Sequence, residues 1–333
     1  MGPSARPPVR CLVVGRYPEP DLELVRRLAG PEQVDLVVVP PGQPTEGVGE
    51  VDCIWRLFSG RLMGISSDPL GEALGSHPEV RWVHTVSAGI DQVREVMREY
   101  PAIVLTNSVG VVAKPIAEFV VGCLLQHCKR YPELRDLQRE RRFEQLPLRE
   151  LADLRVVLLG LGAIGSATAR LLRPFGCQMV GVRRRPGWGA DELVSSVYPA
   201  SALLDACGEA DALVLAAPLT GETAGVVDDR LLGQLRPGSC LVNVARGGLI
   251  DERALLRHLR SGPLAAAFLD AFEEEPLSPE SPLWEAPGVF ISPHVSWSSS
   301  NFTRRSCELF GEQLGRFVRR EPLLNVADLA RGY

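Results

Sequence analysis

The stretch Arg155-Val-Val-Leu-Leu-Gly-Leu-Gly-Ala-Ile-Gly165 joins an apolar run to three glycines in the spacing G-x-G-x-x-G. Residues 156–159 are typical of a parallel strand covered on both faces, and a helix is expected over 166–172. In such a unit the first glycine permits a tight turn, the second lets a pyrophosphate approach the backbone, and the third brings helix and strand together. The stretch predicts a dinucleotide site with phosphates at the amino end of the helix. A glycine-rich turn without a ligand is the alternative.

More strands are expected on the carboxyl side of this turn, each an apolar run bounded by turn or helix residues. They cover residues 178–183, 211–216, 239–245, 264–270 and 289–292. One of the intervening helices has Asp251 as its N-cap and ends near Gly262. Six strands that begin at a glycine turn predict a doubly wound nucleotide-binding sheet.

Residues 9–110 alternate short apolar runs with helical stretches, which predicts a second parallel α/β sheet. Strands are expected at 9–14, 34–39, 51–57, 80–85 and 102–106, and helices at 21–28 and 89–100. An apolar helix over 115–129 should lead into a charged helix and surface loop over 131–149. A final helix over 299–319 is placed where it can pack back onto the first domain.

These elements predict an α/β chain with two doubly wound parallel sheets. Residues 113–296 would form the dinucleotide-binding domain, inserted in a substrate-binding domain of residues 1–112 and 297–333. The two crossings, near 110–115 and 295–300, would form a hinge. Because open α/β sheets bind ligands at the carboxyl ends of their strands, we expect the two strand-end faces to meet in a cleft.

Composition excludes several classes of protein. The net charge of −5 gives no general attraction to nucleic acid or to an anionic membrane. No apolar run has transmembrane length, and residues 1–8 lack the apolar core of a signal peptide. The eight cysteines form no C-x-x-C pair, so neither a zinc site nor a disulfide framework is indicated. We expect a cytoplasmic protein without a metal site.

Three stretches with reactive side chains each follow an expected strand of the nucleotide domain. They are Val242-Asn-Val-Ala-Arg-Gly-Gly-Leu-Ile-Asp251, Leu269-Asp-Ala-Phe-Glu-Glu-Glu-Pro-Leu277 and Ser292-Pro-His-Val295. In this order, after the glycine turn, they resemble the D-isomer-specific 2-hydroxyacid dehydrogenase family. Ala217-Pro-Leu-Thr-Gly-Glu-Thr223 is also similar, and Ser87-Ala-Gly-Ile-Asp91 more loosely so. The resemblance implies a Rossmann domain inserted in a flavodoxin-like substrate domain, a small 2-keto or 2-hydroxy acid as substrate, and a homodimer.

Arg246, Glu275 and His294 are the expected catalytic residues. An arginine fork can hold a carboxylate with two hydrogen bonds and polarise the adjacent carbonyl. Hydride addition to a ketone leaves an alkoxide, and an imidazolium can supply the missing proton near neutral pH. The resemblance places Glu275 beside His294, where a carboxylate favours the charged imidazolium; Glu273 and Glu274 are alternatives in the same run. A Glu here also differs from the amide of the formate dehydrogenase branch.

Further ligand contacts are expected at the other motif residues. The backbone N–H groups of Ser87, Ala88 and Gly89 form a candidate anion cradle for the substrate carboxylate. The resemblance implies that Asp270 binds the nicotinamide carboxamide, whereas an Asp that caps a strand-end turn is the alternative. Substrate contacts are expected at Ser87, Ala88, Gly89, Arg246, His294 and Trp297. Cofactor contacts are expected at Gly160, Gly162, Ala163, Ile164, Gly165, Arg183, Arg184, Ala217, Pro218, Thr223, Val244, Ala245, Arg246, Asp270 and His294.

The second strand of the nucleotide domain ends in Arg183, where NAD-specific sheets carry an acid for the ribose 2′-hydroxyl. Arg184 and Arg185 follow directly. Arginines at this position can bind a 2′-phosphate, so the sequence predicts that NADP(H) is preferred and that NAD(H) remains possible. A basic surface turn in an enzyme of mixed preference is the alternative.

Trp297 stands three residues after His294. It could form a wall of the substrate pocket or pack at the hinge, and in this one respect the chain resembles the C-terminal-binding corepressor branch of the family. Length and apparent NADP preference are more similar to glyoxylate/hydroxypyruvate reductases. We therefore expect an NADPH-linked reductase of a small 2-keto acid, with a nucleotide-sensing binding protein of the corepressor type as the alternative.

Overall fold

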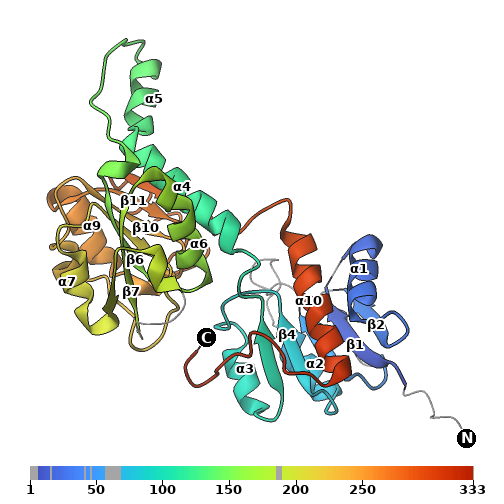
Figure 1. Ribbon diagram of the computed structural model, residues 1–333. Coiled ribbons are helices and arrows are strands. Elements are labelled where there is room, and N and C mark those ends of the chain that lie inside the picture. Colours follow the sequence, from blue (N-terminus) through green and yellow to red (C-terminus); the bar gives the residue numbers. More distant parts are fainter. Residues whose placement is uncertain are drawn as a thin grey trace, which may run out of the picture. The chain divides into compact units, whose positions relative to one another are not determined.

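The structure is a computed structural model that describes residues 7–15, 17–40, 43–45, 47–56, 69–184 and 190–332 (Figure 1). Three features used above fall outside these residues: the start of the chain, where no signal-peptide core was found, Leu57 at the end of an expected strand, and Arg185. The chain divides into two compact units. The first unit is Met1–Val112 with Ser299–Tyr333, and the second unit is Ala113–Ser298.

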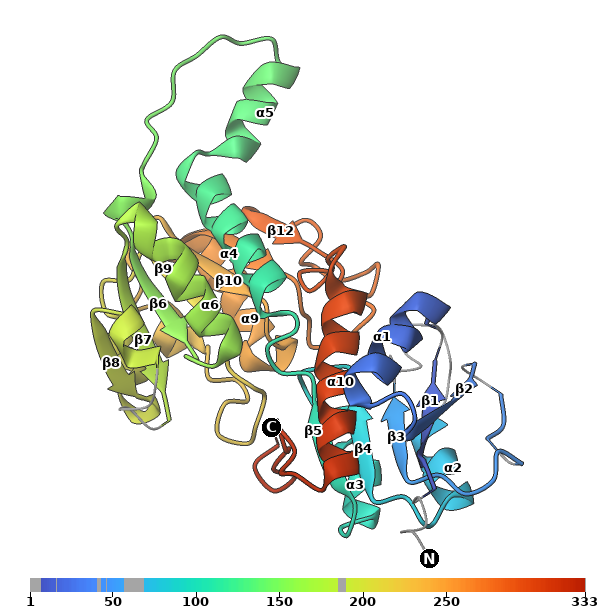
Figure 2. The ribbon, with the colours of Figure 1, turned by 45° about the vertical axis from the view of Figure 1, so that its right-hand side comes forward.

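The first unit is built on a parallel sheet with the strand order β2-β1-β3-β4-β5, which is that of flavodoxin-like folds. The strands are β1 (Val9–Val14), β2 (Val34–Val39), β3 (Cys53–Arg56), β4 (Trp82–Thr85) and β5 (Val104–Asn107). The helices are α1 (Glu19–Ala29), α2 (Pro69–Ser76), α3 (Arg94–Glu99) and α10 (Phe302–Arg319). Helix α10 packs side by side with α1 (Figures 1 and 2), so the two ends of the chain belong to one unit.

The second unit contains a parallel sheet with the order β12-β11-β10-β9-β6-β7-β8. Its strands are β6 (Arg155–Leu159), β7 (Gln178–Arg183), β8 (Ser196–Pro199), β9 (Ala212–Leu215), β10 (Ser239–Asn243), β11 (Leu264–Leu269) and β12 (Val289–Ile291). Its helices are α4 (Ala113–Cys128), α5 (Tyr131–Arg139), α6 (Ala163–Leu172), α7 (Leu203–Cys207), α8 (Asp229–Leu232) and α9 (Glu252–Ser261). The chain runs outward from β6 to β8 and then returns to β9, so the topological switch lies between β6 and β9. The prediction of two doubly wound parallel sheets is confirmed.

Several expected boundaries were wrong. The second sheet has an additional strand, β8, which the sequence pattern did not reveal because it is a short, half-exposed edge strand that ends in Pro199. The helix expected over 89–100 begins only at Arg94, and the residues before it form turns. Helix α2 was also missed, since Gly71 and Gly75 weaken its helical pattern. Within the first unit, these turns after β4 carry the candidate anion cradle.

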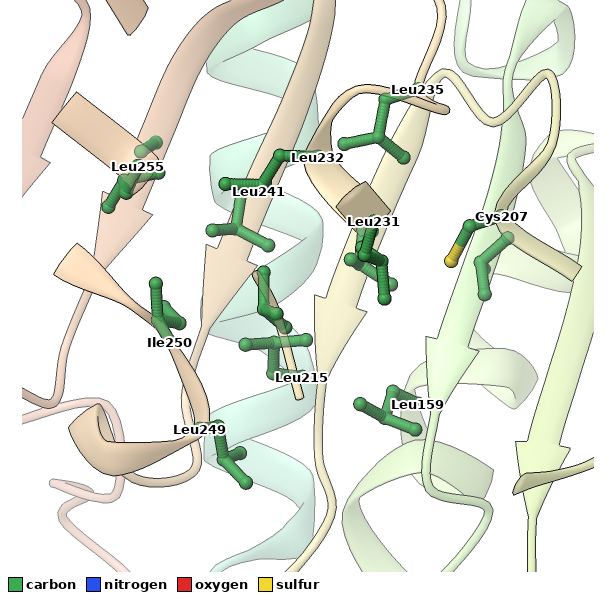
Figure 3. Packing of buried hydrophobic residues seen from close by; sticks show 14 of the residues in the cluster. Leu159, Cys207, Leu215, Leu231, Leu232, Leu235, Leu241, Leu249, Ile250 and Leu255 are labelled. Carbon is green, nitrogen blue, oxygen red and sulfur yellow. The ribbon is translucent and has the colours of Figure 1, made fainter. Parts of the chain in front are cut away.

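The core of the second unit fixes the strand ends from which the site projects. Figure 3 shows Leu159, Leu215 and Leu241 of the neighbouring strands β6, β9 and β10 gathered with Leu232 of α8 and Leu255 of α9. All five side chains are buried. At roughly 2 kcal/mol for each fully buried leucine, this packing supplies the rigid base that a positioned site requires.

The eight cysteines are all free thiols, and seven of them are buried. Burial raises the pKa of the Cys207 thiol to about 12, so it stays protonated and packs as a small apolar side chain. Among the residues described, no helix combines the length and the apolar composition needed to cross a membrane.

Candidate active site

The glycine turn after β6 has the geometry that the sequence predicts. Gly160 has a φ of +103°, and a Cβ there would lie 2.7 Å from the carbonyl oxygen of Ala216. A Cβ on Gly165 would overlap with the carbonyl oxygen of Gly160, so only glycine lets α6 approach the strand this closely. The turn therefore holds the first helical turn of α6 directly above the carboxyl end of β6.

The space above Gly162 is suited to an anion. A Cβ on Gly162 would meet nothing within 4 Å. Gly162 is the N-cap of α6 and offers no side-chain cap, and in the described part of the chain the N–H groups of Gly162, Ala163 and Ile164 meet no acceptor. Open space beside unpaired N–H groups at a helix amino terminus fits a phosphate group. The residues present thus fit a dinucleotide cofactor.

Arg183 and Arg184 stand beside this turn. The N–H of Gly160 donates to the carbonyl oxygen of Val182 at 2.8 Å, which brings the end of β7 next to the glycine turn. Arg183 is the last residue of β7 and Arg184 follows it on the surface. The strand end that carries an acid in NAD-specific sheets therefore carries positive charge here.

The loop after β9 forms another edge of this candidate cofactor site. Ala217 is buried, and the Thr223 hydroxyl donates to the carbonyl oxygen of Pro218 at 2.7 Å. The same hydroxyl oxygen accepts from the N–H of Thr220 at 2.8 Å. These two bonds join residues 218, 220 and 223 within the loop, so the loop is held in shape without a ligand.

Arg246 is held by a loop that Asn243 organises. The fully buried Asn243 side chain accepts from the N–H of Ala245 at 3.1 Å and donates to the carbonyl oxygen of Arg246 at 3.0 Å. A Cβ on Gly247 would overlap with the backbone of Phe272, so this loop packs directly against the segment after β11. Val244 and Ala245 complete the buried side of the loop. Asn243 was not among the expected site residues, although it lies within the motif that carries Arg246.

His294 and Glu275 form the pair that the sequence suggests. The Nδ1 of His294 lies 2.9 Å from Oε2 and 3.1 Å from Oε1 of Glu275. Glu275 also accepts from the N–H of Phe272 at 3.0 Å. Glu273 and Glu274 are exposed and form no such bond with His294. Because Glu275 engages Nδ1, the Nε2 of His294 is the ring nitrogen that can serve a substrate.

The charge state of Glu275 follows from competing effects. Burial alone raises the pKa of its carboxyl group, but the hydrogen bonds from His294 and from the N–H of Phe272 outweigh burial. The positive charge of Arg246 acts in the same direction as these bonds. The pKa of Glu275 therefore lies below its ordinary value, and the group is a carboxylate at neutral pH.

Asp270 holds the turn that carries His294. His294 has a φ of +52°, a left-handed conformation that costs a non-glycine residue about 1 kcal/mol or more. The buried Asp270 carboxylate accepts from the N–H groups of Val295 at 2.8 Å and Ser296 at 3.0 Å, and from the Ser292 hydroxyl at 2.6 Å. Asp270 thus caps the turn, which is the role considered as its alternative from the sequence. The Ser292 hydroxyl donates to the same carboxylate.

Trp297 belongs to the same turn. Its indole N–H donates to the carbonyl oxygen of His294 at 2.7 Å. Neither of the two roles considered for Trp297 from the sequence, a pocket wall or hinge packing, anticipated this bond to the backbone of the candidate proton donor.

The candidate anion cradle lies in the first unit, after β4. All three of its carbonyl oxygens are occupied: Ser87 accepts from the N–H of Ser108, Ala88 from the Asn107 side chain and Gly89 from the Ser87 hydroxyl. By contrast, the N–H groups of Ser87, Ala88 and Gly89 meet no acceptor among the residues that the structure describes. Consecutive N–H groups with their carbonyls turned away are the arrangement that binds a carboxylate. Asn107 and Ser108, at the end of β5, were not expected from the sequence.

Comparisons with known proteins identify the family of the chain. A family model described as "D-isomer specific 2-hydroxyacid dehydrogenase, NAD binding domain" matches residues 121–296, more than half of the chain. The chain belongs to this family. The predicted family, enzyme class and NAD-binding domain are therefore confirmed.

Two relatives illustrate the similarity of this 2-hydroxyacid dehydrogenase. Glyoxylate/hydroxypyruvate reductase A of Klebsiella pneumoniae (strain 342) is 30% identical over 283 residues, which cover 80% of this chain and 89% of the relative. The protein of the same name from Escherichia fergusonii is 30% identical over 282 residues, covering 80% of this chain and 88% of its own.

Two solved structures share the whole fold of the dehydrogenase. The NADPH-dependent glyoxylate/hydroxypyruvate reductase of Sinorhizobium meliloti, in complex with NADP and sulfate, superposes with a TM-score of 0.82 at 28% identity, covering 98% of this chain and 100% of the other. A D-isomer-specific 2-hydroxyacid dehydrogenase from Xanthobacter autotrophicus, in complex with NADPH and MES, gives a TM-score of 0.82 at 30% identity, covering 97% and 99%. Within the described part of this chain, no group of three or more His, Cys, Asp or Glu side chains could hold a metal ion.

Proposed function

We propose that this dehydrogenase reduces a small 2-keto acid, such as glyoxylate or hydroxypyruvate, to the D-2-hydroxy acid, with NADPH as the preferred reductant. The observation that carries the proposal is the bond between His294 Nδ1 and Glu275, with the charge of Arg246 acting on the same carboxylate. The curated relatives named glyoxylate/hydroxypyruvate reductase A support this substrate class.

The chemistry assigned to these residues is a reduction in which the carbonyl carbon gains a hydride and the carbonyl oxygen gains a proton. When bound, the nicotinamide cofactor supplies the hydride. Arg246 binds the substrate carboxylate through its guanidinium fork and polarises the carbonyl next to it. His294 donates the proton from Nε2, and Glu275 stabilises the imidazolium before transfer and fixes the ring through Nδ1. His294 then takes up a new proton from solvent.

The cradle of the first unit is assigned to the substrate carboxylate as well. The unpaired N–H groups of Ser87, Ala88 and Gly89 carry no formal charge, so they would bind a carboxylate through directional hydrogen bonds. Trp297 was also expected to contact the substrate, and that assignment remains a proposal.

The preference for NADPH rests on the end of β7. Arg183 and Arg184 replace the acid that binds a ribose 2′-hydroxyl, and guanidinium groups bind a 2′-phosphate strongly. The Sinorhizobium meliloti and Xanthobacter autotrophicus structures contain NADP and NADPH, respectively, which supports the same choice. The remaining cofactor contacts are assigned to the glycine turn, to the loops after β9 and β10, and to Asp270 and His294.

The two carboxylate oxygens of Asp270 differ in how well they suit a contact with the nicotinamide. Oδ1 already accepts two hydrogen bonds, whereas Oδ2 accepts one, from Ser296. A carboxylate oxygen can accept about two bonds, so Oδ2 is the atom that can also bind the nicotinamide carboxamide.

A homodimer is supported by an arm of the second unit, formed by α5 and residues 140–149. Figures 1 and 2 show this arm projecting from the remainder of its unit, and none of the residues of α5 is buried. Tyr131, Leu134, Phe143 and Leu148 are exposed large apolar side chains on it, and Phe143 is fully exposed. Such a patch is suited to bind a second copy of the chain. Light scattering that gives the mass of a single chain would rule out the dimer.

A cytoplasmic location is supported by the free thiols, since a reducing compartment keeps cysteines unpaired. Recovery of the native protein from an extracytoplasmic fraction of the source cell would contradict this assignment.

The function is tested by following the near-ultraviolet absorbance of the reduced nicotinamide with glyoxylate, hydroxypyruvate, pyruvate and a bulkier keto acid. Each substrate is combined with NADPH and with NADH. Turnover that favours NADPH would support both the reaction and the role of Arg183 and Arg184. Turnover only with NADH would retain the reaction and reject the cofactor preference. Nucleotide binding without turnover would favour the nucleotide-sensing protein of the corepressor type.

A further inference from the structure

The turn that carries His294 contains a peptide unit that is held at both ends. The carbonyl oxygen of His294 accepts from the Trp297 indole N–H at 2.7 Å. The N–H of the same peptide unit, which belongs to Val295, donates to Asp270 Oδ1 at 2.8 Å. Because a peptide unit is planar, two bonds on opposite sides fix its orientation.

Fixing this peptide also restrains the backbone from which the imidazole projects. The orientation of the His294–Val295 peptide relative to the His294 Cα is the ψ angle of His294. His294 is the residue with a φ of +52°, and it would gain free energy by relaxing to an ordinary conformation. Any such rotation would break the bond from Trp297, the bond to Asp270, or both, so the two bonds together resist it.

The remaining bonds of the turn do not replace the one from Trp297. The N–H of His294 donates to Ser292 and the N–H of Ser296 donates to Asp270, but neither bond restrains the carbonyl of His294. The indole closes a local ring from residue 294 to residue 297.

We propose that Trp297 is a positioning residue for the proton donor: its indole N–H holds the His294–Val295 peptide and thereby keeps the imidazole aimed at the reacting oxygen. This inference rests on the proposed function, because a proton donor needs this alignment only if it serves a reaction. A displacement of about 1 Å is enough to lower a rate by up to about a hundredfold.

The test compares Trp297→Phe, which removes the N–H and keeps an aromatic ring, with Trp284→Phe. Trp284 is a matched control because its indole also donates to a backbone carbonyl, that of Ser278 at 2.9 Å, in an exposed loop. We expect kcat of Trp297→Phe to fall about tenfold or more for a small and for a bulky keto acid alike. KM and NADPH affinity should change by less than about twofold, and Trp284→Phe should behave as the native protein.

Other results would overturn the proposal. An unchanged kcat would show that the indole N–H does not position His294. A changed preference between small and bulky substrates, with kcat for the small one retained, would mean that Trp297 is a pocket wall. If Trp297→Phe fails to fold, benzothienylalanine can be placed at position 297, because it replaces the indole N–H with sulfur at nearly constant size. Its kcat, compared with that of the native protein, then decides whether the N–H positions His294.

A second readout does not need turnover. The Nδ1 proton of His294, shared with Glu275, should give a downfield NMR resonance that Glu275→Gln shifts or removes. We expect this resonance to broaden in Trp297→Phe and to persist in Trp284→Phe; a sharp resonance in Trp297→Phe would reject positioning. A native protein that reduces no keto acid would instead reject the proposed function, and the NMR comparison would still decide the role of Trp297.

Discussion

Two histidines of this molecule lie in contrasting environments, one among hydroxyl groups in a buried strand and the other against a carboxylate. His84 lies in β4 of the first unit's sheet and is fully buried. His294 follows β12 in the second unit and is bonded to a carboxylate. The ring nitrogens of His84 are bonded to hydroxyl groups: Nδ1 lies 2.7 Å from the Thr106 oxygen and Nε2 lies 3.1 Å from the Ser108 oxygen.

The network around His84 fixes its neutral form. The Ser108 hydroxyl donates to the carbonyl oxygen of Thr85, so it accepts from Nε2–H of His84. In the neutral ring with its proton on Nε2, Nδ1 is an acceptor, so the Thr106 hydroxyl donates to it while accepting from the Trp82 indole. Burial lowers the pKa of His84 to about 3, so the ring remains neutral at physiological pH. His84 is thus held away from charge by burial and hydroxyl partners, whereas His294 lies against a carboxylate.

The largest expected effect is on turnover. His294→Ala should lower kcat by about a thousandfold, because it removes the proposed proton donor, while NADPH should still bind because the other contacts assigned to the cofactor remain. His127→Ala, a change on α4, is the control and should retain turnover. Steady-state kinetics and fluorescence titration measure both quantities. Full turnover by His294→Ala would mean that another group is the acid.

The next effect concerns stability in acid. The folded pKa of His84 is about 3 and the ordinary value is 6.5, so between these values the unfolded chain binds the extra proton and acid favours unfolding. From about pH 7 to about pH 4 the native protein should lose about 3 kcal/mol more unfolding free energy than His84→Gln, which cannot titrate. Urea unfolding of both proteins across this range measures the difference. Parallel pH profiles would show that His84 is not the cause.

The smallest effect tests the hydroxyl that links His84 to Trp82. Thr106→Val keeps the shape of a buried residue but leaves the Trp82 N–H and His84 Nδ1 without a partner, which should cost about 2 kcal/mol of unfolding free energy. Thr303→Val, at a half-buried position of α10, is the control and should cost much less. Equal losses in both variants would argue against the network.

Much of the fold could be predicted because its signals are local. The expected strand boundaries at Val9–Val14, Val34–Val39 and Gln178–Arg183 agree with the structure, since buried parallel strands are continuous apolar runs. Strand β8 and helix α2 were not predicted, because an exposed edge strand and a glycine-containing helix lack a clear hydrophobic periodicity. Residues 89–93 were mistaken for helix; they include a turn closed by the N–H of Val93 and the carbonyl oxygen of Ile90, and they follow residues 87 and 88, which are held by Ser108 and Asn107 from a distant part of the sequence.

The sequence by itself determined the two parallel sheets, the glycine turn and the dehydrogenase family, because each depends on residue types at fixed short spacings. It also pointed to Arg246, Glu275 and His294 as residues to examine together. The resemblance pointed to Glu275 rather than Glu273 or Glu274, and the tertiary structure shows its bond to His294. Only the tertiary structure showed that Asp270 and Trp297 hold the left-handed turn. A hydrogen bond tolerates a change of only a few tenths of an ångström in its length, and the distances between these strand ends are set by the packing of the second unit.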